Sequence, residues 1–275
     1  MGLRINTNLA ANAVHRLISK SQRETVSTMK QLASGNRFAD ISENAGDYAI
    51  SEQLRGQIAS QKAARRNADN AISFAAIAEG GLSEQTNILI RLREISIQSA
   101  SDTFDDRERE MLDMEFQQLN LELDRIAKST QFSSQKLLAG DEKEYEFHIG
   151  AYGEEEDIVR YKSDTNTTTQ ALGTNGLGVS DKQDARDSLQ TIDEALEKLS
   201  FARAGFGAIQ SRLSTVVNNS DVQIENLEAA RSRIADVDIA ETYSKMTKNA
   251  VLGQYQAAVL AQANQLPQTV LRLLA

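Results

Sequence analysis

The chain has 275 residues, with one proline, no cysteine, no tryptophan and a formal net charge of −9. The absence of cysteine excludes disulfide frameworks, thiolate metal sites and thiol nucleophiles. No apolar run is long enough to span a membrane, and residues 1–8 lack the apolar core of a secretory signal peptide. Export would therefore need a dedicated machine. A single proline and few aromatic residues are typical of a protein built from long helices.

The charge is unevenly distributed along the chain. Residues 1–37 carry a net +5 and residues 240–275 a net +2, so residues 38–239 carry −16. An acidic body disfavours nucleic acid as a partner. The basic residues near the N-terminus are dispersed along an expected helix, which favours a solvated helix face over a segment that binds nucleic acid or a membrane surface.

Near the N-terminus, small and apolar residues recur at alternating spacings of three and four, the heptad pattern of a helix packed on other helices. These positions are Ala11, Val14, Ile18, Ser21, Thr25, Thr28 and Leu32. Gly35 can adopt a left-handed conformation, so it predicts the C-terminal end of this helix.

The heptad pattern resumes between residues 44 and 99 and predicts one very long helix. Alanine occupies many of its positions, which predicts close packing between helices; the positions are Ile50, Leu54, Ala64, Ala68, Ala71, Ala75, Ala78, Leu82, Leu89 and Leu92. Thr103 with Asp106 predicts a capping box after a turn at residues 100–104. A shorter amphipathic helix is expected next, with Leu112, Phe116, Leu119, Leu123 and Ile126 on its apolar face.

The middle of the chain carries the single strand signal that we identify. Tyr145, Phe147 and Ile149 alternate with polar residues, and an apolar run follows at residues 158–161, which predicts a β-hairpin near residues 143–162. Residues 165–178 have the composition of an exposed loop. Ser180 with Gln183 predicts the cap of the next helix.

The longest heptad pattern runs from Ala185 to Ile234 and changes phase at residues 235–238, which predicts a joint there. A last pattern follows at Ile239, Tyr243, Met246, Ala250, Gly253, Ala257, Leu260 and Asn264. Its small residues predict close approach to neighbouring helices. Chain ends are usually polar, so the four large aliphatic residues among the last six predict an end that is buried in an assembly.

The two longest expected helices, near residues 44–99 and 180–235, would each span about 85 Å at about 1.5 Å per residue. Matched lengths predict that they pair. The expected fold is therefore mainly α, an elongated antiparallel bundle of long helices with paired N- and C-terminal coiled-coil helices and one small β-hairpin. We expect a terminal coiled-coil domain of residues 1–43 and 236–275, and a helical bundle domain of residues 44–235.

No pattern of a catalytic or metal site stands out. His15 and His148 lie far apart in sequence, without the spacing of metal ligands. The glycine-rich residues 173–178 lack the strand and the Lys-Ser/Thr pair of a phosphate-binding loop. Acidic clusters at residues 105–106 and 154–157 fit helix caps and turn tips. We therefore expect no enzyme activity, no metal and no cofactor.

The chain closely resembles bacterial flagellin at both ends and over most of the middle. The motifs that carry the resemblance are Ile5–Asn8, Leu32–Gly35, Ala49–Ser51, Arg91–Glu94 with Gln98–Ala100, and Ala261–Gln268. The resemblance implies a secreted structural subunit that polymerises into the extracellular flagellar filament used for swimming motility. Because only residues 141–179 separate Gly140 from Ser180, the chain is similar to a short flagellin without the outer variable domains.

The terminal helices supply the candidate contacts between subunits, because a head-to-tail interface whose rotation does not close generates an open helical polymer. The candidate residues of this filament core are Val14, Ile18, Leu32, Ile239, Tyr243, Met246, Ala250, Ala257, Leu260, Leu271 and Leu274. One alternative is a flagellin-like hook–filament junction protein, which the Ala-Asn-Gln-Leu-Pro-Gln motif near the C-terminus disfavours. Another is an intracellular coiled-coil adaptor, which would not require a Leu-rich C-terminus.

Further partners are implied by the resemblance alone. They are the flagellar type III export system, a flagellar export chaperone that holds residues 239–275, and the hook-associated and cap proteins of the filament. Many flagellins are also bound by a host innate immune receptor, and Arg91, Ile95 and Glu115 stand at the matching positions. The alternative is that these three residues serve contacts within the bundle or between subunits. We expect neither nucleic acid nor a membrane as a partner.

Overall fold

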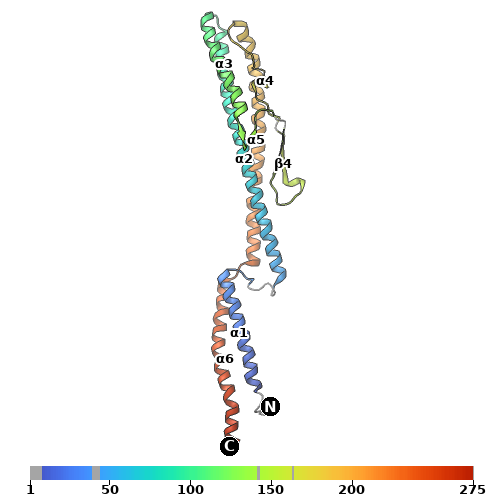
Figure 1. Ribbon diagram of the computed structural model, residues 1–275, viewed down its shortest axis with the longest axis vertical. Helices are drawn as coiled ribbons and strands as arrows, with labels where there is room; N and C mark the ends of the chain where they lie inside the picture. The colour runs from blue at the N-terminus through green and yellow to red at the C-terminus, as the bar shows by residue number, and fades with distance from the viewer. Residues whose placement is uncertain (1–7, 39–43, 141–142, 163, 275) are drawn as a thin grey trace. The chain divides into compact units, whose positions relative to one another are not determined.

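The computed structural model describes residues 8–38, 44–140, 143–162 and 164–274, with side chains described up to residue 265. In chain order the elements are α1 (Leu9–Ser34), α2 (Ala45–Ser99), α3 (Asp106–Ser129), β1 (Gln131–Phe132), β2 (Gln135–Lys136), β3 (Glu144–His148), the 3-10 helix η1 (Glu155–Asp157), β4 (Ile158–Lys162), α4 (Thr169–Leu172), α5 (Lys182–Ala235) and α6 (Ile239–Leu274). The predicted mainly α fold with long helices is confirmed (Figure 1).

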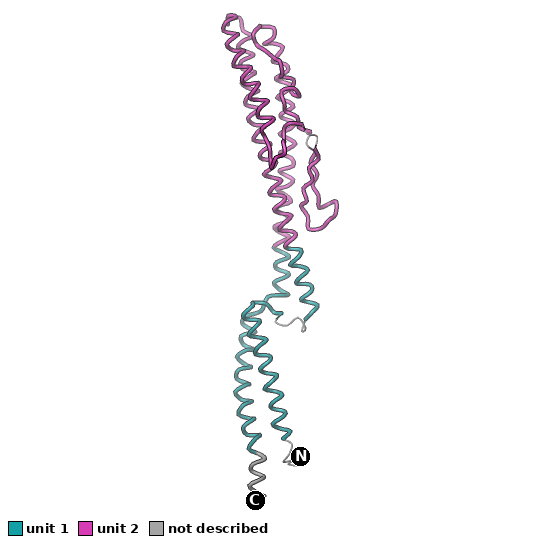
Figure 2. The backbone as a smooth tube through the Cα atoms, viewed as in Figure 1, with its two compact units in different colours: residues 1–58, 225–275 teal, residues 59–224 magenta. Residues whose placement is uncertain are grey.

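The chain divides into two compact units (Figure 2). One consists of residues 1–58 with residues 225–275, and the other of residues 59–224. The first contains α1, α6, the start of α2 and the end of α5. The second contains the remainder of α2 and α5 together with α3, α4 and the strands. The terminal domain expected from the sequence lies wholly within the first unit.

The core of the second unit is built on the heptad positions of α2 and α5. The alanines at the heptad positions of α2 are buried, and Leu82, Leu89 and Leu92 are fully buried; the alanines are Ala64, Ala68, Ala71, Ala75 and Ala78. Gly81 packs so closely that a Cβ there would lie 2.7 Å from Thr130 Oγ1. One predicted position of α2 is wrong: Ile50, in the first unit, is 48% exposed, and the adjacent Ser51 is buried instead.

An aromatic cluster attaches the hairpin to the helices. Phe74 of α2 lies with its ring centroid 4.7 Å from that of Tyr145 and 5.6 Å from that of Phe147, both on β3, and 6.5 Å from that of Phe206 on α5. Strands β3 and β4 pair antiparallel in the register Glu144↔Lys162 to His148↔Ile158, so the predicted hairpin is confirmed. Alternate side chains of a strand share a face, which places both β3 rings on α2.

The helix ends lie close to their predicted positions, but the residues that cap α3 differ from the predicted ones. The joint predicted at residues 235–238 is confirmed, because α5 ends at Ala235 and α6 begins at Ile239. The capping box of α3 uses Asp105 and Glu108, and not the predicted Thr103 and Asp106, because Thr103 Oγ1 pairs with Ser101 Oγ at 2.8 Å. The short strands β1 and β2 were not predicted; two residues each are too few to show an alternating pattern.

The segment between β4 and α5, residues 164–181, is called here the β4–α5 connection. The prediction of an exposed loop at residues 165–178 is wrong for part of that range, since Thr167, Leu172 and Thr174 are buried, and Val179, just beyond it, is buried as well. Buried backbone groups need hydrogen-bond partners. The connection satisfies some of them itself, as in the bond from Thr174 N to Thr169 O at 2.9 Å. Side chains of the helices satisfy others.

One polar stripe on α3 provides three of these partners. Asn120 Nδ2 donates to Thr174 O at 2.8 Å, and Gln117 Nε2 donates to Leu177 O at 2.9 Å. Asp113 Oδ1 accepts a hydrogen bond from the backbone N–H of residue 179 at 2.8 Å. Residues three and four apart share a helix face, so one face of α3 follows the connection along its path.

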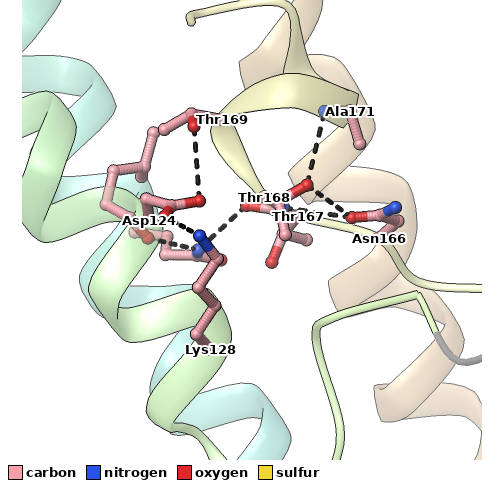
Figure 3. A network of polar contacts seen from close by, with 9 residues as sticks. Asp124, Lys128, Asn166, Thr167, Thr168, Thr169 and Ala171 are labelled. Carbon is pink, nitrogen blue, oxygen red and sulfur yellow. Dashed lines mark hydrogen bonds and ion pairs between the residues drawn. The ribbon is translucent and has the colours of Figure 1, made fainter.

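The same stripe ends at Asp124, which anchors the N-terminus of α4 (Figure 3). Thr169 Oγ1 donates to Asp124 Oδ1 at 3.3 Å, and Lys128 forms an ion pair with Asp124 Oδ2. Thr168 Oγ1 accepts from Ala171 N at 3.4 Å and caps α4. The hydrogen bond and charge of the Lys128 ammonium lower the pKa of the Asp124 carboxyl.

A buried serine of α2 gives a test of this anchoring. Ser99 Oγ donates to Val179 O at 2.5 Å, so Ser99→Ala should cost about 1–3 kcal/mol by leaving a buried carbonyl without this donor. Chemical denaturation followed by circular dichroism would measure the cost. Ser73→Ala is the control, since Ser73 is exposed and bonds only within α2 to Asp69 O, and it should change stability by less than about 0.5 kcal/mol. Equal shifts for the two variants would contradict the anchoring role.

The Asp124 anchor should also depend on pH. A carboxyl group whose pKa is lowered by folding stabilises the fold above its ordinary pKa, here 3.8, and the stabilisation is lost as the pH falls through the folded value. The protection factors of residues 164–179, which are exchange rates corrected for the intrinsic pH dependence, should therefore fall as the pH is lowered from neutral to about pH 3. In Asp124→Asn the protection factors of the segment should already be lower at neutral pH and should fall less on acidification. An unchanged acid response in Asp124→Asn would rule out this carboxylate as its source.

Candidate assembly surface

Helices α1 and α6 lie side by side in the first unit (Figure 1). They run antiparallel, because Asn8 Nδ2 donates to Ala263 O at 2.8 Å whereas Ser21 Oγ donates to Asn249 O at 3.3 Å. Gly35, with φ of 68°, ends α1 in the left-handed conformation predicted from the sequence. The N-terminal and the C-terminal helix of the described chain therefore pack against each other.

The predicted heptad face of α1 is the face that packs within the chain. Ala11, Ser21 and Thr28 are buried, and the other four predicted positions are half-buried; these are Val14, Ile18, Thr25 and Leu32. Three of the seven positions are Ser or Thr, so little large apolar surface is buried between the helices. Pairing of α1 with α6 is correspondingly weak for its length.

Helix α6 presents a different set of residues from the predicted one. Its buried and half-buried positions spaced by four and three are Thr242, Met246, Asn249, Gly253, Gln256, Leu260 and Ala263. Of these, Met246, Gly253 and Leu260 belong to the predicted pattern. The remaining predicted residues lie about one residue further around the helix and are exposed; we call Ile239, Tyr243, Ala250 and Ala257 the exposed stripe of α6. The side chains of Leu271 and Leu274 lie outside the described residues.

The terminal helices also expose large apolar side chains that a soluble monomer would usually bury. Ile239 is 68% exposed, Tyr243 is 59% exposed and Tyr255 is 68% exposed. On α1 the exposed set is Leu9, Leu17, Val26 and Met29. Around Gly253, nothing lies within 4 Å of a Cβ built on the residue, so α1 does not require a glycine there. Contiguous exposed apolar surface marks a place where another molecule binds.

Charge divides the paired helices into two halves. From Asn249 to Leu271 the sequence has no Asp, Glu, Lys or Arg, and neither do residues 9–15 of α1. The hydrogen bond from Asn8 to Ala263 places these uncharged stretches together. The other half is basic, with a groove lined by Lys20, Arg23, Lys30, Lys245 and Lys248 together with Glu24. The uncharged half is a signal that the sequence analysis missed.

The three residues matched to a receptor contact separate into a surface pair and a core residue. Arg91 donates from Nε and Nη2 to Glu115 Oε1 at 3.0 and 2.8 Å, and both side chains are exposed. The Glu115 carboxylate raises the pKa of Arg91. Ile95 is 0% exposed, so in this fold it packs in the bundle core and cannot contact a partner directly. The reason is its position on the core-facing side of α2.

The described residues contain no group of three or more His, Cys, Asp and Glu side chains placed to hold a metal ion. His15 lies on α1 and His148 on β3, in different units. None of the described helices is long and apolar enough to cross a membrane.

Two family models of bacterial flagellin match the N-terminal and the C-terminal parts of the chain. Residues 5–143 match the bacterial flagellin N-terminal helical region, and residues 189–274 match the bacterial flagellin C-terminal helical region. The chain is 39% identical to a flagellin of Halalkalibacterium halodurans, covering 98% of this chain and 99% of the relative. It is 37% identical to the flagellar filament 33 kDa core protein of Treponema phagedenis, again covering 98% and 99%.

A solved structure has a similar fold. The crystal structure of Bacillus cereus flagellin aligns with a TM-score of 0.51 at 28% identity, covering 60% of this chain and 94% of that structure.

Proposed function

We propose that this chain, which belongs to the bacterial flagellin family and is a structural subunit of the flagellar filament, binds its neighbours chiefly through the exposed faces of α1 and α6. The observation that carries the proposal is the apolar surface of these helices, with Ile239, Tyr243 and Tyr255 each more than half exposed. Burying one large apolar side chain stabilises an interface by about 1.5–3 kcal/mol. Repeated at every subunit, such contacts would hold a polymer together.

The uncharged half of the pair is suited to the most tightly packed part of the filament. Burial of an unpaired ion is costly, and residues 249–271 contain none. Ala250, Gly253 and Ala257 leave little side chain between backbones, which permits helices of neighbouring copies to approach closely. We therefore place the uncharged half in the filament core. We assign residues 1–43 and 236–275 to the terminal domain that forms this core, and residues 44–235 to the helical bundle domain.

The offset between the two stripes of α6 explains how one helix could serve two partners. The α1-facing positions include Thr242 and Asn249, whereas Tyr243 and Ala250 of the exposed stripe each lie one residue later. A neighbour can pack on the exposed stripe without displacing α1. If the exposed stripe meets a different surface of the neighbour, the contact is heterologous, and a heterologous contact that does not close on itself grows as an open helix. The alternative of a hook–filament junction protein is less favoured, because the relatives reported above are a flagellin and a filament core protein.

The same proposal extends to location and to other partners. A filament outside the cell requires export, and the lack of cysteine suits a chain that passes unfolded through the flagellar type III system. Exposed apolar residues of α6 would then need a flagellar export chaperone before assembly. Hook-associated and cap proteins would bind at the ends of the filament. For a host innate immune receptor, Arg91 and Glu115 are the accessible residues.

Substitution at Ala257 tests the exposed stripe. Ala257→Leu should leave the monomer folded, because residue 257 is exposed, but it should overpack an inter-subunit contact at a cost of about 1–3 kcal/mol. Sedimentation on filament seeds should show impaired polymerisation, with unchanged circular dichroism of the monomer. Ala257→Ser is the matched control and should polymerise normally. Normal filaments from Ala257→Leu would remove this residue from the interface.

The weak pairing of α1 with α6 predicts that assembly orders both ends. Ordering a residue costs about 1–2 kcal/mol in backbone entropy, and helices without tertiary partners are marginal. Hydrogen exchange should find residues 1–35 and 239–275 unprotected in the monomer and protected in the filament, with residues 50–234 protected in both. Strong protection of both ends in a verified monomer would show that the pair is stable by itself and would exclude folding coupled to assembly.

A further inference from the structure

The β4–α5 connection contains the one Asn–Gly dipeptide of the sequence, Asn175–Gly176. It stands in a tight turn, in which Leu177 N donates to Thr174 O at 3.3 Å and Gly176 has φ of 77°. A glycine with positive φ at the third position is typical of a type II turn. Both residues are exposed, and nothing lies within 4 Å of a Cβ built on Gly176. The turn therefore projects from the buried part of the connection into solvent.

We propose that Asn175 is a site of spontaneous deamidation, with water as the co-reactant. The deprotonated backbone nitrogen of Gly176 attacks Cγ of Asn175, and the new N–Cγ bond closes a five-membered succinimide. The bond between Cγ and Nδ2 breaks, and the nitrogen leaves as ammonia. Water then opens either carbonyl of the succinimide, which yields aspartate or isoaspartate at residue 175. The net change replaces one amide by one carboxylate.

The surroundings leave the reacting atoms accessible. Glycine carries no side chain that would shield its nitrogen, and among the described residues Gly176 N–H donates to no protein acceptor. The turn's hydrogen bond of 3.3 Å is longer than the usual 2.9–3.0 Å of an N–H···O bond, so it adds little to the restraint on Asn175, whose backbone N–H donates to Thr169 O at 3.1 Å. Asn166 is the contrasting case, because its Oδ1 accepts from Thr168 N and Thr168 Oγ1, and a β-branched threonine follows it.

The reaction would alter the main chain between two backbone carbonyl groups that side chains of α3 hold by hydrogen bonds. Thr174 O is held by Asn120 and Leu177 O by Gln117, both on α3. Isoaspartate adds a methylene group to the main chain between these two carbonyls, so both bonds cannot keep their present geometry. The new carboxylate also adds negative charge to a segment already anchored by Asp113 and Asp124. Deamidation should therefore loosen the connection without touching the terminal helices.

The test is a time course on the full-length folded protein, kept at neutral to mildly alkaline pH in water enriched in oxygen-18. Peptide mass spectrometry should find the label in a carboxylate at residue 175 and at no comparable rate at Asn166. An isoaspartyl methyltransferase should transfer methyl groups to the same peptide. Asn175→Gln should suppress both signals, because its longer side chain closes a ring far more slowly. Hydrogen exchange of residues 164–179 should be faster in the aged protein than in fresh protein.

The comparison that decides the proposal is with a free peptide of residues 172–179 in the same tube. If the peptide deamidates while Asn175 of the folded protein stays intact, the turn protects the residue and the proposal fails. Labelling that appears only after urea denaturation would lead to the same conclusion. None of these outcomes depends on filament assembly, so they are independent of the proposed assembly surface.

Discussion

The antiparallel pairing of α1 with α6 is the interaction on which the arrangement of the first unit depends, because it brings residues near the two ends of the chain together. The pairing is built from Ser21, Thr28, Thr242 and Asn249 as much as from aliphatic side chains. A helix pair of this composition buries little apolar surface and depends partly on hydrogen bonds such as that from Asn8 to Ala263. Because such bonds contribute little net free energy, the pair is only weakly stable. Large apolar residues are instead kept on the outside, where only another molecule can bury them.

Sequence periodicity predicted most of the fold, for a physical reason. A helix of the second unit that buries Leu82, Leu89 and Leu92 must repeat apolar residues along one face, and the repeat is visible without coordinates. On α6 the same reasoning selected the exposed stripe together with Met246, Gly253 and Leu260 of the α1-facing side, because that side also carries Thr242, Asn249 and Gln256 and so looks polar. Periodicity finds the most apolar face of a helix, and in a subunit of a polymer that face need not be the one packed within the chain.

Contacts made by backbone atoms were beyond the reach of the sequence analysis. Residues 165–178 have a loop composition, yet Thr167 and Thr174 are buried because Gln85 and Asn120 bond to their carbonyl oxygens. The candidate receptor residues show a similar limit. Spacing alone places Arg91 and Ile95 on neighbouring turns of α2, but only the packing of α3 shows that Arg91 meets Glu115 at the surface while Ile95 is enclosed.

The way α3 holds the β4–α5 connection has a consequence for how the two segments tolerate change. Asn120 and Gln117 recognise carbonyl oxygens, and a carbonyl oxygen is the same in every amino acid. The conformation of the connection therefore depends in large part on side chains of α3, which lie about fifty residues earlier in the chain. Exposed positions of the connection should therefore tolerate substitution. The polar stripe of α3 should tolerate it less, although its sequence is that of an ordinary solvated helix face.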